Sequence, residues 1–277
     1  MDVRYSPDPA RFQRMTTNEM REAFLVDQLF KPDEIYMIYS HIDRAIVGSA
    51  VPVKNELKLE ASKKELAADY FAQRREIGIL NIGGTGTVLV NSDRFELENK
   101  DCLYIGKGRR SVSFSSKNPE QPAGFYFVSY PAHITYPTLL VKQNEAEPVA
   151  LGSQKEANKR TIYKYVHPNG IQSCQLVLGF TVLDEGSVWN TMAAHTHERR
   201  SEIYMYFDLP ENALVCHLMG QPEETRHVVV RNGQAVISPS WSVHSGAGTS
   251  NYAFVWSMGG ENQDFDDMDW VEMNRLS

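Results

Sequence analysis

Residues 195–202 read His-Thr-His-Glu-Arg-Arg-Ser-Glu, and residues 239–244 read Pro-Ser-Trp-Ser-Val-His. In an extended strand His195 and His197 point to the same face, because side chains alternate with a period of two. Glu202 lies an odd number of positions beyond His197, so one uninterrupted strand would place it on the opposite face. We therefore expect the chain to turn between them and to return as a hairpin that carries Glu202 on the neighbouring strand.

Four of these side chains form a ligand set for a divalent metal ion: His195, His197, Glu202 and His244. Neutral imidazoles and a carboxylate suit zinc, and also Fe(II), Mn(II) and Ni(II). Taken singly, a His-x-His pair is more often structural, and so is a glutamate before an apolar strand. A histidine pair on one strand face, an inward glutamate and a third histidine after a proline turn all fit one β-barrel. The sequence therefore predicts a metal site inside such a barrel.

The composition is that of a soluble globular protein. The 277 residues suffice for one large domain or two modest ones, and 42% of them are hydrophobic and 23% charged. The net charge of -7 argues against a nucleic-acid surface. We expect no membrane span and no secretion signal, because no apolar run is long enough. Three widely spaced cysteines without a CxxC pair favour a reducing compartment, which predicts a cytoplasmic protein.

Short strand-like runs punctuated by Gly, Asn and Asp fill most of the chain. Two helices are predicted among them. One covers 19–30 and is capped by Asn18, and the other begins with the capping box Ser62-Lys-Lys-Glu65. The stretch of about 137–165 carries Pro, Gln and Lys and is predicted to be a linker between two strand-rich series.

The two strand-rich series resemble each other. Two pairs of segments match in the same order: Gln73–Leu80 with Glu198–Met205, and Lys100–Gly108 with Gly233–Trp241. On this alignment Ser111 falls opposite His244, and no histidine pair precedes Glu76. The pattern predicts a duplicated fold, with a first half over 1–145 that lacks metal ligands and a metal-binding second half over 146–277.

The pattern HxHxxxxE followed by PxxxxH resembles the two metal motifs of the cupin superfamily. Cupins are antiparallel barrels of jelly-roll type that hold a metal ion in the barrel interior. The chain departs from the usual motifs at two positions, since Gly186 stands farther from the histidine pair and Trp241 replaces a glycine. The resemblance implies an all-β bicupin, made of two jelly-roll (double-stranded β-helix) barrels with a few short helices.

Nearly the whole chain resembles the 5-keto-4-deoxyuronate isomerases, a bicupin family of bacterial pectin breakdown. Many segments carry this resemblance in order, among them Tyr39–Arg44, Arg74–Glu76, Tyr104–Gly108, Thr135–Thr138, Trp189–Met192, Gly260–Asn262 and Phe265–Asp269. The resemblance implies one zinc ion per subunit on His195, His197, Glu202 and His244, and a homo-hexamer. It also implies a small-molecule uronate as substrate, and neither a nucleic acid nor a membrane as partner.

The activity that the resemblance implies is an aldose–ketose isomerisation. It would convert 4-deoxy-L-threo-5-hexosulose uronate to 3-deoxy-D-glycero-2,5-hexodiulosonate, by proton transfer through an enediol or by a hydride shift. Candidates for the proton-transfer group are Tyr204 and Tyr206, which share strand parity with Glu202, and Glu261. Arg199 and Arg226 are candidates for binding the substrate carboxylate, because a guanidinium suits bidentate carboxylate binding.

Two other function classes use the same ligands. A metal-dependent cupin oxygenase or decarboxylase would place Fe(II) or Mn(II) on them. A non-catalytic sugar- or metal-binding bicupin would need no open coordination position. An oxygenase would need oxygen for its reaction, whereas an isomerase would not. A non-catalytic binding protein would turn over no substrate.

Overall fold

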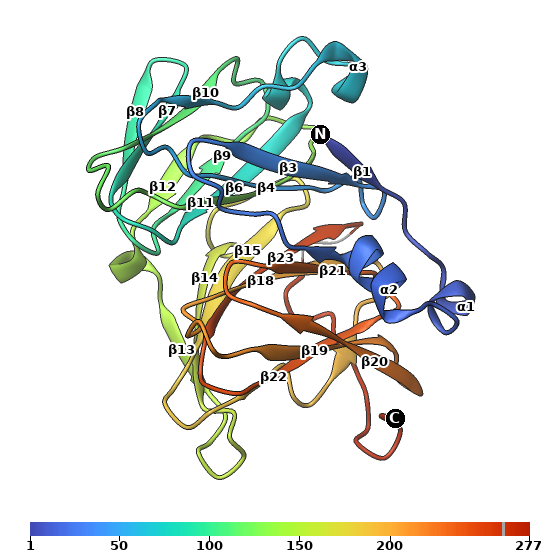
Figure 1. Ribbon diagram of the computed structural model, residues 1–277. Coiled ribbons are helices and arrows are strands. Elements are labelled where there is room, and N and C mark those ends of the chain that lie inside the picture. The colour runs from blue at the N-terminus through green and yellow to red at the C-terminus, as the bar shows by residue number, and fades with distance from the viewer. Residues whose placement is uncertain (262–263) are drawn as a thin grey trace. The chain divides into compact units, whose positions relative to one another are not determined.

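Two pairs of facing sheets, antiparallel except where β1 joins β3, form the protein in a computed structural model, which describes residues 1–261 and 264–277 (Figure 1). The expected all-β class is confirmed. The few helices are short: α1 (Pro9–Phe12), α2 (Thr17–Phe24), α3 (Lys63–Leu66) and the 3-10 turns η1 (Phe71–Gln73) and η2 (Gln143–Glu145). No helix within the described ranges is long and apolar enough to cross a membrane.

The first pair of sheets contains eleven strands: β1 (Asp2–Arg4), β3 (Ile35–Ser40), β4 (Ile46–Ala50), β5 (Leu57–Lys58), β6 (Arg75–Asn81), β7 (Gly86–Val90), β8 (Asp93–Leu97), β9 (Cys102–Ile105), β10 (Val112–Ser116), β11 (Phe125–Pro131) and β12 (Leu139–Val141). One sheet has the order β1-β3-β4-β11-β6-β9-β12, and the other has the order β5-β10-β7-β8. Apolar side chains from both sheets fill the space between them, among them Ile77, Ile79, Phe114, Phe125 and Phe127.

The second pair of sheets contains eleven further strands, and a two-stranded ribbon accompanies it: β2 (Leu25–Val26), β13 (Pro148–Leu151), β14 (Arg160–Val166), β15 (Val177–Leu183), β16 (Trp189–Asn190), β17 (His195–Thr196), β18 (Arg200–Phe207), β19 (Val215–Gln221), β20 (Glu224–Val230), β21 (Ala235–Ser238), β22 (Val243–Gly248), β23 (Ala253–Gly260) and β24 (Asp269–Trp270). The large sheet has the order β13-β14-β15-β23-β18-β21-β2, and the small one has the order β16-β22-β19-β20. Strands β17 and β24 form the ribbon.

The predicted duplication is confirmed by the strand orders. In each large sheet two central strands pair in the same way, β6 with β9 and β18 with β21. The registers also correspond, since Ile77 pairs with Ile105 and Glu202 pairs with Ser238. Ile77 therefore occupies the position of Glu202. Glu76 corresponds instead to the residue before Glu202, so its side chain faces away from the sheet interior.

Glu76 accordingly has a structural partner set of its own. Its buried carboxylate accepts hydrogen bonds from the Tyr104 hydroxyl at 2.7 Å and from the backbone N–H groups of Cys174, Gln175 and Leu176 at 2.7–2.9 Å. Burial, followed by the negative charge of Glu76, raises the pKa of the Tyr104 hydroxyl far above its ordinary value. At this strand the first pair of sheets thus repeats the topology of the second with a buried structural carboxylate in place of a cavity-facing one.

The chain folds into two compact units that are not continuous in sequence. The first contains 1–4, 28–147 and 165–177, and the second contains 5–27, 148–164 and 178–277. Residues 5–27 join the second unit because α1 and α2 pack against its strands and β2 forms the edge of its large sheet. The expected halves, 1–145 and 146–277, stay a prediction.

Two predictions of local structure were wrong. The first helix is capped by Thr16, which forms a capping box with Glu19, and it ends at Phe24 because Leu25 and Val26 pair with β21 as a strand. The supposed linker over 137–165 contains β12, η2, β13 and most of β14. Every residue of β13 is exposed, so the strand lacks the apolar alternation that would have indicated it. The capping box at Ser62 is confirmed.

Gly179 on β15 allows close packing beneath the indole of Trp256. A Cβ built on Gly179 would lie 2.3 Å from Trp256 Cζ2 and 2.3 Å from the Tyr163 carbonyl oxygen. Gly179→Ala should therefore destabilise the fold by about 1–3 kcal/mol, because the backbone oxygen cannot move aside easily. Thermal or urea denaturation measures this. Gly124→Ala is the matched control, since the nearest atom to its Cβ would be 3.5 Å away; an equal loss in both variants would contradict the packing argument.

Candidate metal centre

Three strands and the residue after one of them bring the predicted ligands together. His195 lies on β17, His197 directly follows it, Glu202 lies on β18 of the large sheet, and His244 lies on β22 of the small sheet. The chain turns at residues 198–199, as expected. The predicted hairpin is nevertheless wrong, because β17 pairs with β24 and not with β18.

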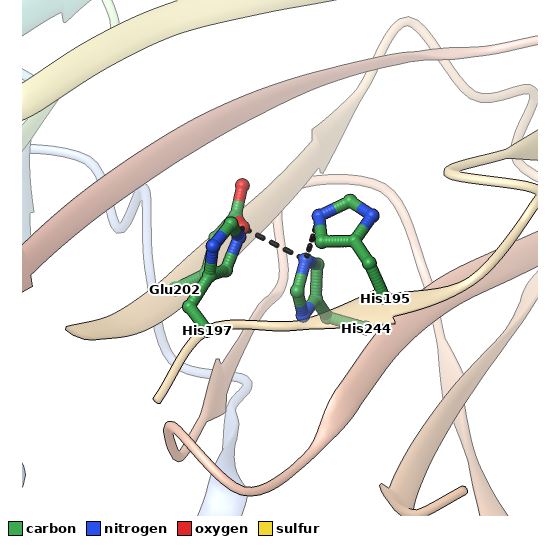
Figure 2. A group of neighbouring side chains, drawn as sticks. All are labelled: His195, His197, Glu202 and His244. Atoms are coloured by element: carbon green, nitrogen blue, oxygen red, sulfur yellow. Dashed lines mark hydrogen bonds and ion pairs between the residues drawn. The ribbon is translucent and has the colours of Figure 1, made fainter. Parts of the chain in front are cut away.

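The four side chains converge on one point, as Figure 2 shows. The Nε2 atom of His244 lies 2.8 Å from Glu202 Oε2 and 3.1 Å from His195 Nε2. His197 Nε2 lies 3.2 Å from Glu202 Oε2. All four residues are at most 7% exposed, and their ligand atoms lie within 4.8 Å of one another. This is the arrangement that a buried divalent cation requires.

Hydrogen bonds on the far side of two rings leave the converging nitrogens available. The Nδ1 atom of His197 lies 3.0 Å from Asp267 Oδ1, and the Nδ1 atom of His244 lies 3.3 Å from the Ser242 carbonyl oxygen. Both oxygens are acceptors, so they favour the tautomer with the hydrogen on Nδ1, which leaves the lone pair on Nε2 for a metal ion. Asp267 in turn forms an ion pair with the buried Arg200 guanidinium. The cluster therefore fits a metal ion in its donor atoms and in its tautomers.

The protonation states favour the same conclusion. Burial, followed by the neighbouring His244, lowers the pKa of His195 to about 2, so its imidazole is neutral at physiological pH. Burial alone would raise the pKa of the Glu202 carboxyl, but the contacts from His244 and His197 hold it well below its usual value. Neutral imidazoles and an ionised carboxylate are the forms that bind metals.

A cavity of about 170 Å³ opens beside the cluster. This volume is roughly ten times what one water molecule requires, so a small substrate has room next to an ion. His195, His197 and Glu202 line the cavity, and most of the remaining wall is apolar or aromatic: Leu151, Ile162, Met192, Ala193, Phe254, Trp256, Met258, Phe265, Met268 and Trp270. Few polar groups complete the wall, which is typical of a ligand pocket.

The two candidate tyrosines occupy different environments. Tyr204 lines the cavity, and its hydroxyl lies 2.7 Å from the Thr191 hydroxyl. Tyr206 is fully buried, and its hydroxyl lies 2.7 Å from His217 Nδ1. Burial raises the pKa of both phenols, and it lowers the pKa of His217 to about 3. Of these two tyrosines, Tyr204 alone lines the cavity.

Three other predicted residues do not line the cavity, as far as the described residues show. The side chains of Arg199 and Glu261 are largely exposed and lie 3.8 Å apart. Arg226 donates hydrogen bonds to the backbone carbonyls of Phe12 and Met15 near α1. Their predicted roles stay untested, and Asn262 of the motif at 260–262 lies outside the described residues.

Sequence reasoning missed Asp267 and Arg160, both of which belong to the site. Asp267 lies in the segment 265–269 that resembles the isomerase family. Its distance in sequence from His195 and His197 matches no ligand motif, so the sequence did not mark it as part of the site. Arg160 begins β14, inside the supposed linker, where the β-branched and aromatic residues of Thr161–Val166 were the available signal for a strand.

Asp267→Asn should weaken metal binding about 10- to 100-fold, because a neutral amide accepts the hydrogen bond from His197 Nδ1 more weakly than a carboxylate does. Competition with a metal-chelating dye measures the affinity. Asp269→Asn is the matched control, since Asp269 is exposed on β24 and should bind metal normally. Unchanged affinity in Asp267→Asn would show that the carboxylate does not orient the ligand.

Comparison with known proteins identifies the family of the chain. The model of the KduI/IolB family matches residues 24–273. The chain belongs to the KduI/IolB family. A relative from Shouchella clausii is 54% identical over 276 residues, which cover 100% of both chains, and is named 4-deoxy-L-threo-5-hexosulose-uronate ketol-isomerase. A relative from Bacillus subtilis, with the same name and full coverage, is 52% identical.

Solved structures support the cupin-type fold. An IolB-like protein from Salmonella typhimurium has a TM-score of 0.72 at 13% identity, covering 91% of this chain and 97% of that one. Oxalate decarboxylase from Bacillus subtilis, which has Mn(II) centres, has a TM-score of 0.56 at 10% identity, covering 83% and 71%. At these identities the likeness concerns the fold alone.

Proposed function

We propose that this KduI/IolB family member is a zinc-dependent 4-deoxy-L-threo-5-hexosulose-uronate ketol-isomerase. One observation carries the proposal: full-length relatives at 50–55% identity bear this name, and the chain buries three histidines and a glutamate beside a cavity. The product would be 3-deoxy-D-glycero-2,5-hexodiulosonate, in the degradation of pectin and other polyuronates.

The reaction moves a carbonyl from C1 to C2, so a hydrogen must leave C2 and one must arrive at C1. When bound, the metal ion supplies a Lewis acid that polarises the substrate oxygens and stabilises negative charge. Tyr204 contributes a hydroxyl held in place by Thr191 at 2.7 Å, which can donate a hydrogen bond or a proton at a substrate oxygen. The apolar wall limits water around the reacting carbons.

We propose zinc as the metal because His, His, Glu and His match its preference for nitrogen and oxygen ligands. The buried cluster would use the Nε2 atoms of His195, His197 and His244 and the carboxylate of Glu202, one ion per chain. The same donors also suit Fe(II) and Mn(II), so metal analysis of purified protein must accompany any assay.

A turnover assay in D₂O tests the proposal. The metal-loaded protein is incubated anaerobically with 4-deoxy-L-threo-5-hexosulose uronate and followed by NMR, with metal content measured on the same sample. We expect the 2,5-diketo product, lost on chelation and restored by zinc. One deuterium at C1 indicates proton transfer with solvent exchange, and none indicates a hydride shift or a shielded proton.

Failure of metal-loaded protein to form the diketo product would overturn the proposal. Consumption of the substrate only after oxygen is admitted, with a product other than the 2,5-diketo compound, would favour the cupin oxygenase. We also propose a cytoplasmic homo-hexamer, on the resemblance to the isomerase family, and the domain division at residues 145–146. Light scattering in solution tests the hexamer, since a chain of 31.4 kDa would give six times that mass.

A further inference from the structure

The cavity beside the metal cluster contains a single lysine or arginine among its described lining residues, and this is Arg160. Glu202 is the single carboxylate among them. All other lining groups are histidine, hydroxyl-bearing or apolar side chains. A single guanidinium in a largely apolar wall indicates a ligand-binding role, because cationic side chains are rare in such pockets unless they bind an anionic group.

Strand alternation explains why Arg160 points into the cavity. Arg160 and Ile162 on β14, Trp256 and Met258 on β23, and Glu202 all face it. The sheet order β14-β15-β23-β18 places Arg160 three strands from Glu202, which is about 14 Å across the sheet. Both side chains line the same cavity of about 170 Å³, which has room for a short carbon chain.

Structural contacts leave N–H donors of the Arg160 guanidinium available to a ligand. Among the described residues, its side chain makes one hydrogen bond, from Nη1 to the Asn158 carbonyl at 2.9 Å, and no carboxylate of theirs lies within ion-pair distance. The guanidinium is half-buried, and this burial lowers its pKa, although arginine stays charged at neutral pH. By contrast, Lys164 on the same strand covers the ring of Phe265 at 3.8 Å.

We infer that Arg160 binds the terminal carboxylate of the substrate and so sets which end of the molecule faces the metal cluster. The inference rests on the proposed function, because it assumes a uronate. A guanidinium offers two parallel N–H donors that match a carboxylate. With its carboxylate on Arg160, a six-carbon acid extends along the apolar wall and presents its carbonyl end to His195, His197 and Glu202. The cavity thereby selects uronates over neutral sugars.

The test compares two substrates and two variants, all on metal-loaded protein. The substrates are the uronate and its C6 carboxamide, which has the same size and no charge. We expect the wild type to prefer the uronate about 10- to 100-fold in kcat/KM, the range of a charge-assisted hydrogen-bond pair. Arg160→Gln should raise KM for the uronate by a similar factor, keep its zinc content and lose the preference. Arg160→Lys should keep part of the preference for the uronate over the carboxamide.

Lys159→Gln is the matched control. Lys159 directly precedes Arg160, but it is exposed and pairs with Asp184 at 2.9 Å outside the cavity. This control should leave KM unchanged. A preference for the uronate that persists in Arg160→Gln would overturn the inference, and so would a rise in KM in Arg199→Gln or Arg226→Gln instead.

Failure of the proposed function has a different signature. In that case the wild-type holoprotein turns over neither substrate. Calorimetric titration with the uronate and the carboxamide then tests the role of Arg160 independently of turnover. Tighter binding of the uronate in the wild type, lost in Arg160→Gln, supports a carboxylate site, and equal binding of both compounds overturns it.

Discussion

Glu202→Gln is expected to abolish zinc binding and isomerase activity together. The substitution keeps the size of the side chain and removes the one negative charge of the buried ligand set. Loss of a supporting residue outside the ligand set typically costs 10- to 100-fold in metal affinity, so loss of a ligand should cost at least about 100-fold. Activity should fall by about 1,000-fold or more, because the metal supplies the stabilisation of charge in the reaction.

Metal analysis after dialysis and the NMR assay on the same sample measure this result. His244→Ala should behave in the same way, since its Nε2 contacts both Glu202 and His195. His227→Gln is the control, because His227 is exposed on β20 and should keep metal and activity. A Glu202→Gln protein that retains stoichiometric zinc and normal turnover would remove this cluster from the reaction.

Tyr204→Phe should retain zinc and lose activity by about 100- to 10,000-fold, which is the range of general acid–base catalysis. The reason is geometric: the hydroxyl lines the cavity, is held by Thr191 and lies on the same face of β18 as Glu202. Steady-state kinetics with metal content measured in parallel test the prediction. A full rate in Tyr204→Phe would leave the hydroxyl without a role in the chemistry.

A second substitution separates the two tyrosines of β18. Tyr206→Phe leaves the buried Nδ1 atom of His217 without its partner and should cost about 1–3 kcal/mol of stability. Its effect on turnover should be much smaller than that of Tyr204→Phe. Tyr163→Phe is the control, since Tyr163 stacks on Phe180 at 4.7 Å away from the cavity lining.

The ligand set and the duplicated topology could be predicted because both leave local marks in the sequence. Histidines two apart share a strand face, and Arg-Arg pairs at 74–75 and 199–200 mark equivalent strands. No comparable sequence pattern indicated that β17 pairs with β24. The hairpin prediction assumed pairing between neighbours in sequence, whereas residues 269–270 close over His195 from the end of the chain.

The remaining errors share a physical cause, which is tertiary context. Leu25 and Val26 continue a helical pattern in sequence but gain more as the edge strand beside β21. Residues 148–151 form a strand although all are exposed, because the adjacent β14 offers hydrogen-bond partners. Arg160 and Asp267 join the site through long-range packing, which spacing along the chain does not encode.

The two copies of this architecture differ at the position that carries Glu202 in the second one. In the first copy, Ile77 occupies the place of Glu202 and belongs to a buried apolar cluster with rings such as Phe114 and Phe127, whose centroids lie 6.2 Å apart. An engineer could not install a second catalytic centre there by grafting ligands alone. A carboxylate at position 77 would be stranded among phenyl rings, so several aromatic side chains would first have to be trimmed to make room for an ion and a substrate.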